Sequence, residues 1–236
     1  MNNHLFKISI IIPTLNEEKN ITNCLDATRE ARDVERIVVD GGSSDRTVEK
    51  ALAWGARVLN SEPGRSRQMN AGARTATGGI LLFLHADTLV SLGFDDQIRK
   101  VLRGPKIVGG AFTFQMDEPS SFSLRVIQKA TNVRSRYWQM PYGDQAIFLT
   151  AKHFREIGGY PDLPILEDFE LIRRLKKRGR IHTASLPAIT SARRWRALGI
   201  WKTTLLNYAI VLAYYAGIPP LRILRFAHRK IGSINL

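Results

Sequence analysis

Several features that would identify a protein class at once are scarce in this sequence. One cysteine, Cys24, among 236 residues excludes an intramolecular disulfide and a cysteine-based zinc site, and it favours a reducing compartment. The pattern Gly-x-Gly occurs nowhere, which argues against a nicotinamide-binding loop. The apolar stretch 205–218 has 14 residues, too few for a membrane-spanning helix of about 20 residues. The first residues contain no long apolar segment, so the sequence predicts no signal peptide.

Acidic residues are also missing, but only from the end of the chain. The sequence has 35 Lys and Arg against 21 Asp and Glu, a net charge of +14. Residues 1–170 contain 21 of each sign, whereas residues 171–236 contain 14 basic residues and no acidic one. A uniformly basic chain would suggest nucleic acid as the partner, but a balanced body with a basic end suggests a surface that faces something anionic.

Apolar runs and amphipathic stretches alternate through the first half of the chain. They predict a first helix at residues 17–31, with Asn16 as its cap. The other elements expected there are strands at 7–13, 36–40, 56–60 and 79–85, and helices at 46–54 and 66–76. This alternation predicts an α/β fold, with a mostly parallel central sheet and helices on both faces. Ligands of such sheets bind at the carboxyl ends of the strands.

The second half shows a less regular alternation. Helices are expected at 95–102, 120–136, 151–157 and 167–178, and strands at 107–116 and 145–150. No repeat or linker is visible, so we expect one domain at residues 1–195 and an appended helical segment at residues 196–236.

Three carboxylates stand at or just beyond the ends of predicted strands: Glu17, Asp40 and Asp87. Each alone could begin a helix or cap a turn. Together they predict a nucleotide pocket, with acceptors for base or ribose and one acid for a metal ion. In a strand, His85 and Asp87 would face the same way, and Asp87 could hold Mg²⁺ or Mn²⁺. The alternative is a neutral, hydrogen-bonded His85 and an Asp87 that caps the next turn.

A helix start with two arginines follows the third predicted strand. Arg65 and Arg67, with Asn70 in the same segment, are residue types suited to an anionic phosphate.

Several short motifs occur in the order found in the family 2 glycosyltransferases. They are Ile12-Pro-Thr-Leu-Asn-Glu-Glu18, Val39-Asp-Gly-Gly-Ser-Ser-Asp-Arg-Thr47, Asn70-Ala-Gly72, His85-Ala-Asp87 and Glu167-Asp168. The chain resembles that family over roughly residues 7–195. Within it, the chain is most similar to the bacterial branch described as selenodomain-associated or arsenosugar-type transferases. That likeness rests on Arg67-Gln-Met-Asn70, Gly143-Asp-Gln145 and Ser191-Ala-Arg-Arg-Trp195.

The resemblance implies a GT-A fold and inverting, metal-assisted transfer from a nucleotide-diphosphate sugar, UDP- or GDP-linked, to an acceptor hydroxyl. It implies roles for matching residues: Pro13 and Glu17 beside the base, Asp40 as acceptor for base or ribose, Asp87 on Mn²⁺ or Mg²⁺, and Asp168 as general base. One departure is His85, which stands where the family's Asp-x-Asp motif has its first acid. Imidazole is a poorer Mg²⁺ ligand than carboxylate.

The base and the acceptor side involve further residues. Asp168 lies in the first turn of the predicted helix 167–178, where the helix N-terminus favours its ionised form. Plain helix capping by Glu167 and Asp168 is the alternative. Asp144 is a second candidate for the base. The resemblance also places Glu167, Asp144 and the segment Arg193, Arg194 and Trp195 on the acceptor and diphosphate side.

The basic end of the chain is also rich in aromatic residues, including Trp201, Tyr208, Tyr214 and Tyr215. Aromatic residues near cations suit the headgroup region of an anionic bilayer. We expect a cytoplasmic protein that contacts the inner face of the plasma membrane, with a sugar or a lipid-linked acceptor. A packed C-terminal helix or a homodimer interface would explain the same residues.

Other functions fit the sequence less well. A nucleotidyltransferase should have a glycine-rich phosphate loop after the first strand, where residues 13–17 contain no glycine. A nucleic-acid-binding protein would explain the net charge but not the acids at the strand ends, so no nucleic-acid partner is expected. An inactive, lectin-like relative would keep the pocket without turnover.

Overall fold

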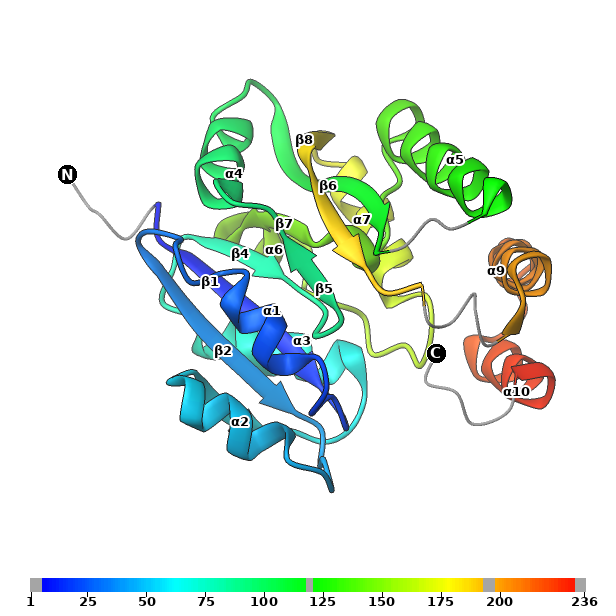
Figure 1. Ribbon diagram of the computed structural model, residues 1–236. Coiled ribbons are helices and arrows are strands. Elements are labelled where there is room, and N and C mark those ends of the chain that lie inside the picture. The colour runs from blue at the N-terminus through cyan, green and yellow to red at the C-terminus, as the bar shows by residue number, and fades with distance from the viewer. Residues whose placement is uncertain (1–5, 118–120, 193–197, 232–236) are drawn as a thin grey trace.

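The computed structural model describes residues 6–117, 121–192 and 198–231. Its centre is a sheet of eight strands in the order β3-β2-β1-β4-β7-β6-β8-β5 (Figure 1). The strands are β1 (Ile8–Thr14), β2 (Val34–Asp40), β3 (Arg57–Asn60), β4 (Ile80–Phe83), β5 (Thr88–Val90), β6 (Ile107–Met116), β7 (Ile147–Thr150) and β8 (Arg180–Thr190).

Helices follow most of the strands. They are α1 (Ile21–Asp26), α2 (Thr47–Trp54), α3 (Arg65–Thr75), α4 (Phe94–Leu102), α5 (Phe122–Trp138), α6 (Ala151–Glu156), α7 (Glu167–Lys176), α9 (Ile200–Tyr215), α10 (Pro220–Ile231) and the short 3₁₀ turn η2 (Gly143–Gln145).

The sheet is mixed, with most strands running the same way. Strands β3, β2, β1 and β4 are parallel neighbours, and β6 is parallel to β8. Strand β7 is antiparallel to both β4 and β6, and β5 is antiparallel to β8. The predicted α/β architecture with helices on both faces is therefore confirmed. The carboxyl ends of β1, β2 and β4 lie at one edge, where a ligand site is expected.

The two faces of the sheet carry separate apolar clusters. Ile10 and Ile12 of β1 belong to the cluster under α1, α2 and α4, whereas Ile11 belongs to the cluster under α3, α6 and α7. Successive side chains of a strand point to opposite faces, so an unbroken apolar run can fill both clusters. Each fully buried isoleucine contributes about 1.5–3 kcal/mol, which fixes the strand that leads into the site.

Two predicted boundaries at the site are wrong. The helix predicted at 17–31 is only α1, and Asn16 does not cap it. Asn16 has a φ of 55°, and its side-chain oxygen instead accepts a hydrogen bond from the Ser44 backbone N–H at 2.9 Å. The strand predicted at 79–85 ends at Phe83, so His85 and Asp87 lie in a turn. The Thr88 N–H closes that turn on the His85 carbonyl at 3.0 Å.

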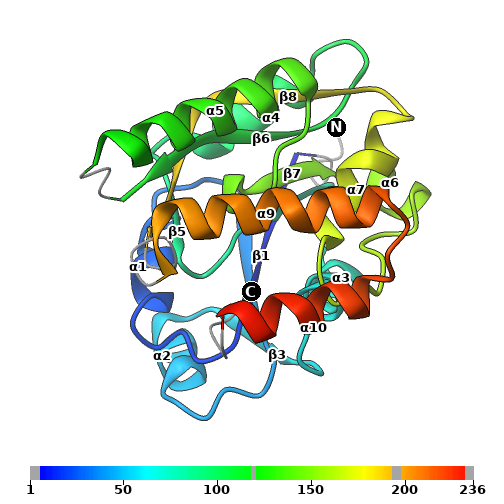
Figure 2. The same cartoon turned by 90° about the vertical axis from the view of Figure 1, so that its right-hand side faces the viewer.

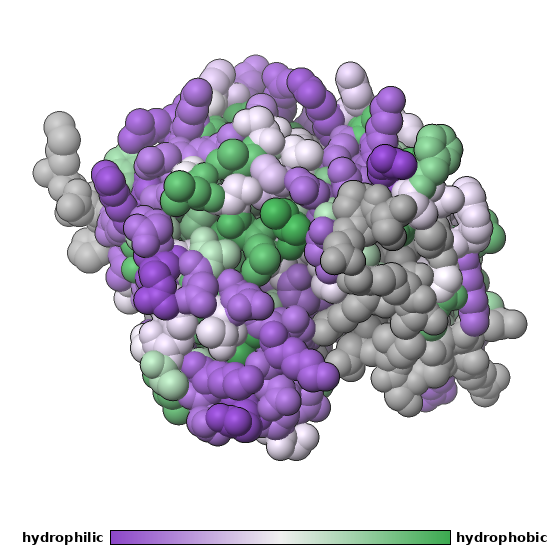
Figure 3. All heavy atoms as spheres, viewed as in Figure 1, coloured by the Kyte–Doolittle hydropathy of each residue, from purple (hydrophilic) through white to green (hydrophobic). Residues whose placement is uncertain are grey.

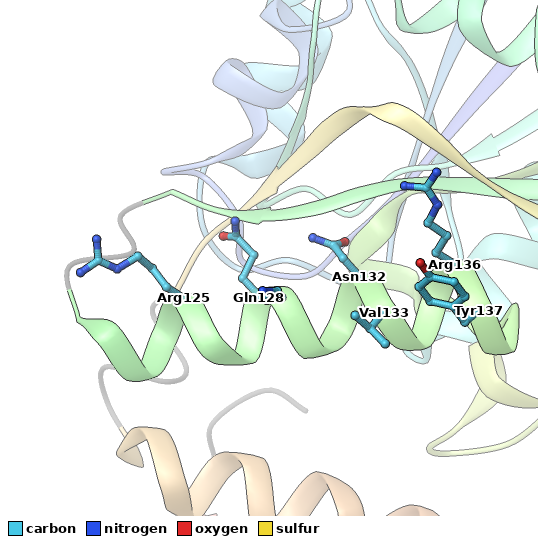
Figure 4. A pocket seen from close by; sticks show the side chains of 7 residues that line it. Arg125, Gln128, Asn132, Val133, Arg136 and Tyr137 are labelled. Atoms are coloured by element: carbon cyan, nitrogen blue, oxygen red, sulfur yellow. The ribbon is translucent and has the colours of Figure 1, made fainter.

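The second half of β6 extends beyond its pairing with β7, and there amide side chains rather than a strand cover its backbone. Asn132 exchanges two hydrogen bonds with the backbone of Phe114, and Gln128 accepts one from Met116. Figure 4 shows Gln128 and Asn132 pointing from α5 toward this strand. Their spacing of four residues places both on one helix face, so α5 satisfies the unpaired strand edge.

The C-terminal helices pack on the rest of the molecule. Leu206 and Ile210 of α9 form a buried cluster with Ile223 and Ala227 of α10, against which the partly buried Ile165 packs. Figures 1 and 2 both show α5, α9 and α10 on the same side of the molecule. Within the described residues, no helix combines the length and the apolar character that crossing a membrane requires.

Candidate active site

A cavity of about 700 Å³ lies beyond the carboxyl ends of the strands. Its walls come from β1, the turn after β4, the start of α3, the η2 turn, the start of α7, the end of β8 and α9. It contains seven of the predicted site residues with ionisable side chains, which are Glu17, Arg65, His85, Asp87, Asp144, Glu167 and Asp168. Pro13 also lines it. The structure therefore brings together residues that are far apart in the sequence.

Asp168 is held at the bottom of this cavity by the η2 turn. Its Oδ2 accepts a hydrogen bond from the Gly143 N–H at 3.1 Å, while Oδ1 is buried and finds no hydrogen-bond partner in the described part of the chain. Burial, with the nearby charge of Glu167, raises the pKa of Asp168 to about 8, although Arg65 acts in the opposite direction. The helix N-terminus favours the ionised form of this carboxyl, and burial acts in the opposite direction.

Gly143 leaves no space between Asp168 and His85. A Cβ atom at this position would lie 2.2 Å from Asp168 Oδ2 and 2.8 Å from His85 Cε1. Any side chain at residue 143 would therefore push the carboxylate or the imidazole out of place. The glycine allows the backbone to approach both groups.

His85 is a neutral imidazole in this site. Burial and the charge of Arg65 lower its pKa to about 3, and its Nε2 is buried without a hydrogen-bond partner among the described residues. The Cys24 thiol of α1 donates to the His85 carbonyl at 3.6 Å, which links α1 to the turn that carries His85. Burial raises the pKa of Cys24, and the charges of Asp87 and Glu17 raise it further, so both carboxylates lie near this thiol.

The residues present could supply part of a metal site. No group of three or more His, Cys, Asp or Glu side chains in the described ranges forms a complete set of ligands. Mg²⁺ and Mn²⁺ are commonly held by one or two protein ligands plus substrate phosphates and water. The Asp87 carboxylate and the unsatisfied Nε2 of His85 fit such a partial set.

Among the arginines that the structure describes, Arg65 is the one that lines the cavity. It is exposed at the start of α3 and makes no salt bridge with an acidic side chain of the described residues. Gln68, one turn further, donates to the carbonyls of Thr14 and Val39 at 2.8 Å each. That amide ties α3 to the ends of β1 and β2, a role that the sequence did not reveal.

Three predicted ligand-binding residues do not line the cavity. Asp40 is buried and accepts hydrogen bonds from the N–H groups of Gly42 and Ser43, so it builds the turn after β2. Arg67 pairs with Glu62 at 2.7 Å and with Asp162 at 3.1 Å. Asn70 exchanges two hydrogen bonds with the backbone of Tyr160. These side chains are already engaged in structural contacts. Arg193, Arg194 and Trp195 lie outside the described residues.

The end of β8 organises the site, and this strand was not predicted. Thr190 donates from its hydroxyl to the Asp144 carbonyl at 2.8 Å, and the Ser191 N–H donates to the Asp87 carbonyl at 3.2 Å. β8 therefore joins the η2 turn to the turn that carries Asp87. The alternating β-branched residues Ile181 and Thr183 after Gly179 were the signal that could have revealed it.

A wall of the cavity comes from the C-terminal segment, which the sequence suggested was separate. Asn207, Ile210 and Val211 of α9 line it. The Phe169 ring of α7 packs edge-on against Tyr214 and Tyr215 of α9. The segment therefore forms part of the site.

Known proteins match this chain in sequence. The model of the family "Glycosyl transferase family 2" matches residues 9–158. The PGL/p-HBAD biosynthesis glycosyltransferase of Mycobacterium bovis is 42% identical over 135 residues, which cover 53% of this chain and 49% of that protein. Glucosyl-3-phosphoglycerate synthase of Mycobacterium tuberculosis is 33% identical over 94 residues, 35% of this chain and 29% of that protein. The chain thus spans about half the length, or less, of these curated relatives.

Solved structures of glycosyltransferases share the fold. Glucosyl-3-phosphoglycerate synthase from M. tuberculosis, in complex with Mn²⁺, UDP and phosphoglyceric acid, matches with a TM-score of 0.65 at 21% identity, over 90% of this chain and 79% of that chain. The mannosyltransferase PcManGT from Pyrobaculum calidifontis, in complex with GDP-Man and Mn²⁺, matches with a TM-score of 0.60 at 19% identity, over 86% and 64%. Identities this low show the fold alone, and these structural matches confirm the GT-A architecture. Since the family model covers more than half of the sequence, the chain belongs to glycosyl transferase family 2.

Proposed function

We propose that this enzyme transfers a sugar, a hexose, from a nucleotide-diphosphate sugar to an acceptor hydroxyl, with inversion at the anomeric carbon. The observation that carries the proposal is the buried Asp168 carboxyl in a cavity that also holds Arg65, His85 and Asp87. One base that deprotonates the acceptor supports a single in-line displacement, and a single displacement inverts the reacting carbon.

Asp168 is the proposed general base. The Gly143 N–H holds Oδ2, which leaves Oδ1 to accept the proton of the acceptor hydroxyl. A carboxylate with a raised pKa is a stronger base than an exposed one, once it is ionised. Asp144 and Glu167 line the same cavity and are proposed to contact the acceptor.

Arg65 and the end of β1 are proposed to bind the donor. A guanidinium at a helix start suits a diphosphate, because arginine and the free N–H groups of the first turn favour anions. Pro13 and Glu17 lie on the same wall and are proposed to border the nucleotide. UDP and GDP-Man occupy solved structures of this fold, so UDP- and GDP-sugars are the first donors to test.

Asp87 and His85 would hold a divalent cation, Mn²⁺ or Mg²⁺, together with the donor phosphates. Such an ion would neutralise the charge that develops on the leaving diphosphate. The neutral state of His85 is the state a ligand requires, because a protonated imidazole has no free lone pair.

The acceptor and the branch of the family belong to the same proposal. We propose a sugar or a lipid-linked hydroxyl as acceptor, and a cytoplasmic enzyme of the selenodomain-associated or arsenosugar-type branch. Of the three motifs that suggest this branch, Gly143-Asp-Gln145 builds the site, whereas Arg67 and Asn70 serve the packing of α3.

Two arginines on α3 give a matched test. UDP-, GDP-, dTDP- and CDP-sugars are screened by thermal shift with and without Mn²⁺, for the native enzyme and for Asp87→Ala, Arg65→Ala and Arg67→Ala. We expect one donor class to stabilise the native enzyme in the presence of Mn²⁺. This stabilisation should disappear in Asp87→Ala and persist in Arg67→Ala. In Arg65→Ala the apparent affinity for the donor should fall about tenfold or more. Equal losses in the two arginine variants would contradict the proposed donor site.

A further inference from the structure

The outer face of α9 is a stripe of exposed apolar and aromatic side chains. Trp201, Leu205, Tyr208, Leu212 and Tyr215 recur every three or four residues, and 57% to 68% of each is accessible to solvent. Residues at this spacing share one face of a helix. The opposite face is apolar too, because Leu206 and Ile210 are buried against α10. A helix that is apolar on both sides requires contact with an apolar phase or a partner on its second side.

A second exposed stripe runs along α5. Phe122, Val126, Val133 and Tyr137 are spaced by four or seven residues, which places them on one helix face, and they are 42% to 76% accessible. Figure 4 shows α5 from close by, with a groove of about 390 Å³ to which Val133, Tyr137 and Arg125 contribute. Helix α10 adds two more exposed apolar residues, Leu221 and Phe226, which are each 52% accessible.

These stripes belong to one side of the molecule, which we call the three-helix face (α5, α9 and α10). Figure 2 turns this side toward the viewer, with α5 at the top, α9 in the middle and α10 below. Figure 3, in a different view, shows mainly hydrophilic residues over α2 and a group of hydrophobic residues in the middle of the view.

The charge of the three-helix face has one sign. Helices α5, α9 and α10 contain no Asp or Glu. Their cations are arginines and lysines between the apolar positions, among them Arg125, Lys129, Lys202, Arg222 and Arg225. Apolar and aromatic side chains between cations match the interfacial region of a bilayer, where acyl chains lie beneath anionic headgroups.

We propose that the three-helix face docks on the surface of an anionic lipid bilayer. A second copy of the chain fits this face less well, because a two-fold contact would bring two acid-free basic faces together. Docking parallel to the surface fits better than spanning, since 16 residues of α9 extend only about 24 Å, against about 30 Å for a bilayer core.

Helix α9 would link the bilayer to the active site. Its outer stripe faces the proposed membrane, while Asn207, Ile210 and Val211 line the catalytic cavity. A helix is about 10–12 Å across, so the cavity would lie within one helix diameter of the lipid surface. Resting on the proposed function, this arrangement selects an acceptor hydroxyl carried by a lipid headgroup.

Vesicle flotation of the full chain tests the surface. Vesicles of phosphatidylcholine with about 30 mol% phosphatidylglycerol are compared with phosphatidylcholine alone, in about 0.1 M salt. The test variants are Leu205→Glu with Leu212→Glu, and Val126→Glu. The matched controls are Leu52→Glu and Leu92→Glu, which change exposed leucines, 57% and 78% accessible, outside these helices. Circular dichroism and thermal melting confirm that each variant is folded.

We expect the native chain and both controls to bind anionic vesicles. The affinity of the test variants for these vesicles should fall about tenfold or more, and that of Lys202→Gln should fall roughly fivefold. No binding by the native chain, or equal losses in the controls, would overturn the proposal. A concentration-dependent dimer that the same test variants dissociate would also overturn it, in favour of a second copy. Asp168→Asn should bind vesicles normally without turnover, so failure of the surface and failure of the catalytic assignment are separate results.

Discussion

Asp168 illustrates how burial sets the chemistry of a carboxyl group in this enzyme. The group lies at a helix N-terminus, which favours the charged form, but it has lost its water and lies near Glu167. Its pKa therefore rises to about 8 instead of falling. The same burial acts oppositely on His85, whose charged form is the protonated one, and lowers its pKa to about 3.

The raised pKa of Asp168 predicts the pH dependence of catalysis. A general base works in its ionised form, so kcat/KM for the native enzyme should increase with pH up to about 8 and level off above it. Initial rates at saturating metal between pH 6 and 9 measure this profile. A profile that is flat across this range would contradict a base whose pKa lies near 8.

The same group should reduce stability at high pH. The pKa of Asp168 is higher in the folded than in the unfolded chain, so its contribution is most favourable below its ordinary value of 3.8 and is lost as pH rises toward about 8. Asp168→Asn does not titrate, so its Tm should exceed that of the native enzyme by an amount that grows between pH 5 and 8. Turnover should be lost at every pH. A constant Tm difference across this range would contradict the assignment.

At the scale of the element, close contact between α3 and the sheet positions Arg65 and Gln68. Gly72 makes that contact possible, because a Cβ atom there would lie 2.5 Å from Ile11 Cγ2 and 3.0 Å from Val39 Cγ2. Strand β8 has a comparable role on the other side, where it joins the turns of Asp87 and Asp144. The cavity is therefore built by α3, which contacts β1 and β2, and by β8, which joins the turns that carry Asp87 and Asp144.

Gly72→Ala should destabilise the enzyme by about 1–3 kcal/mol, since the added methyl group enters a packed interface. Urea unfolding followed by circular dichroism measures the change. Arg74→Ala, an exposed position on the same helix, is the control and should change stability by less than about 0.5 kcal/mol. Equal effects at the two positions would show that α3 does not pack as described.

At the scale of the whole molecule, the C-terminal segment packs against the rest of the chain. The Tyr214 hydroxyl donates to Glu170 at 3.1 Å, and the ring packs on Phe169, so α9 is joined to the helix that carries Asp168. The expected unit at residues 1–195 and segment at residues 196–236 are joined by these contacts, as the alternative of a packed C-terminal helix implies. Composition changes at the boundary, but the apolar clusters and the cavity cross it.

Tyr214→Phe tests whether the two parts unfold together. Loss of a hydrogen bond to a carboxylate should cost about 1–2 kcal/mol of global stability. Tyr208→Phe removes a hydroxyl from the exposed side of the same helix and should have almost no effect. Denaturant unfolding of both variants, followed by far-UV circular dichroism, compares their stability. An unfolding curve unchanged by Tyr214→Phe would mean that α9 is not coupled to the body.

The sequence by itself determined the α/β architecture and most of the ionisable residues that line the cavity. Alternating apolar runs specify strands and helices locally, and acids after parallel strands converge at one edge for any such fold. Asp87 could therefore be located before any coordinates, whereas Asp168, in the first turn of a helix, was assigned its role by the family resemblance. The family resemblance added the roles that residue types alone leave open.

Only the tertiary structure decided which of several equivalent side chains line the cavity. Arg65 and Arg67 are alike in sequence, but Arg67 is paired with Asp162 and Arg65 is not. Asp40 ends a strand like its counterparts, but its oxygens are consumed by the turn beside it. Partners distant in sequence, burial and the wall supplied by α9 set these outcomes, because hydrogen bonds and desolvation depend on neighbours in space and local patterns do not specify those neighbours.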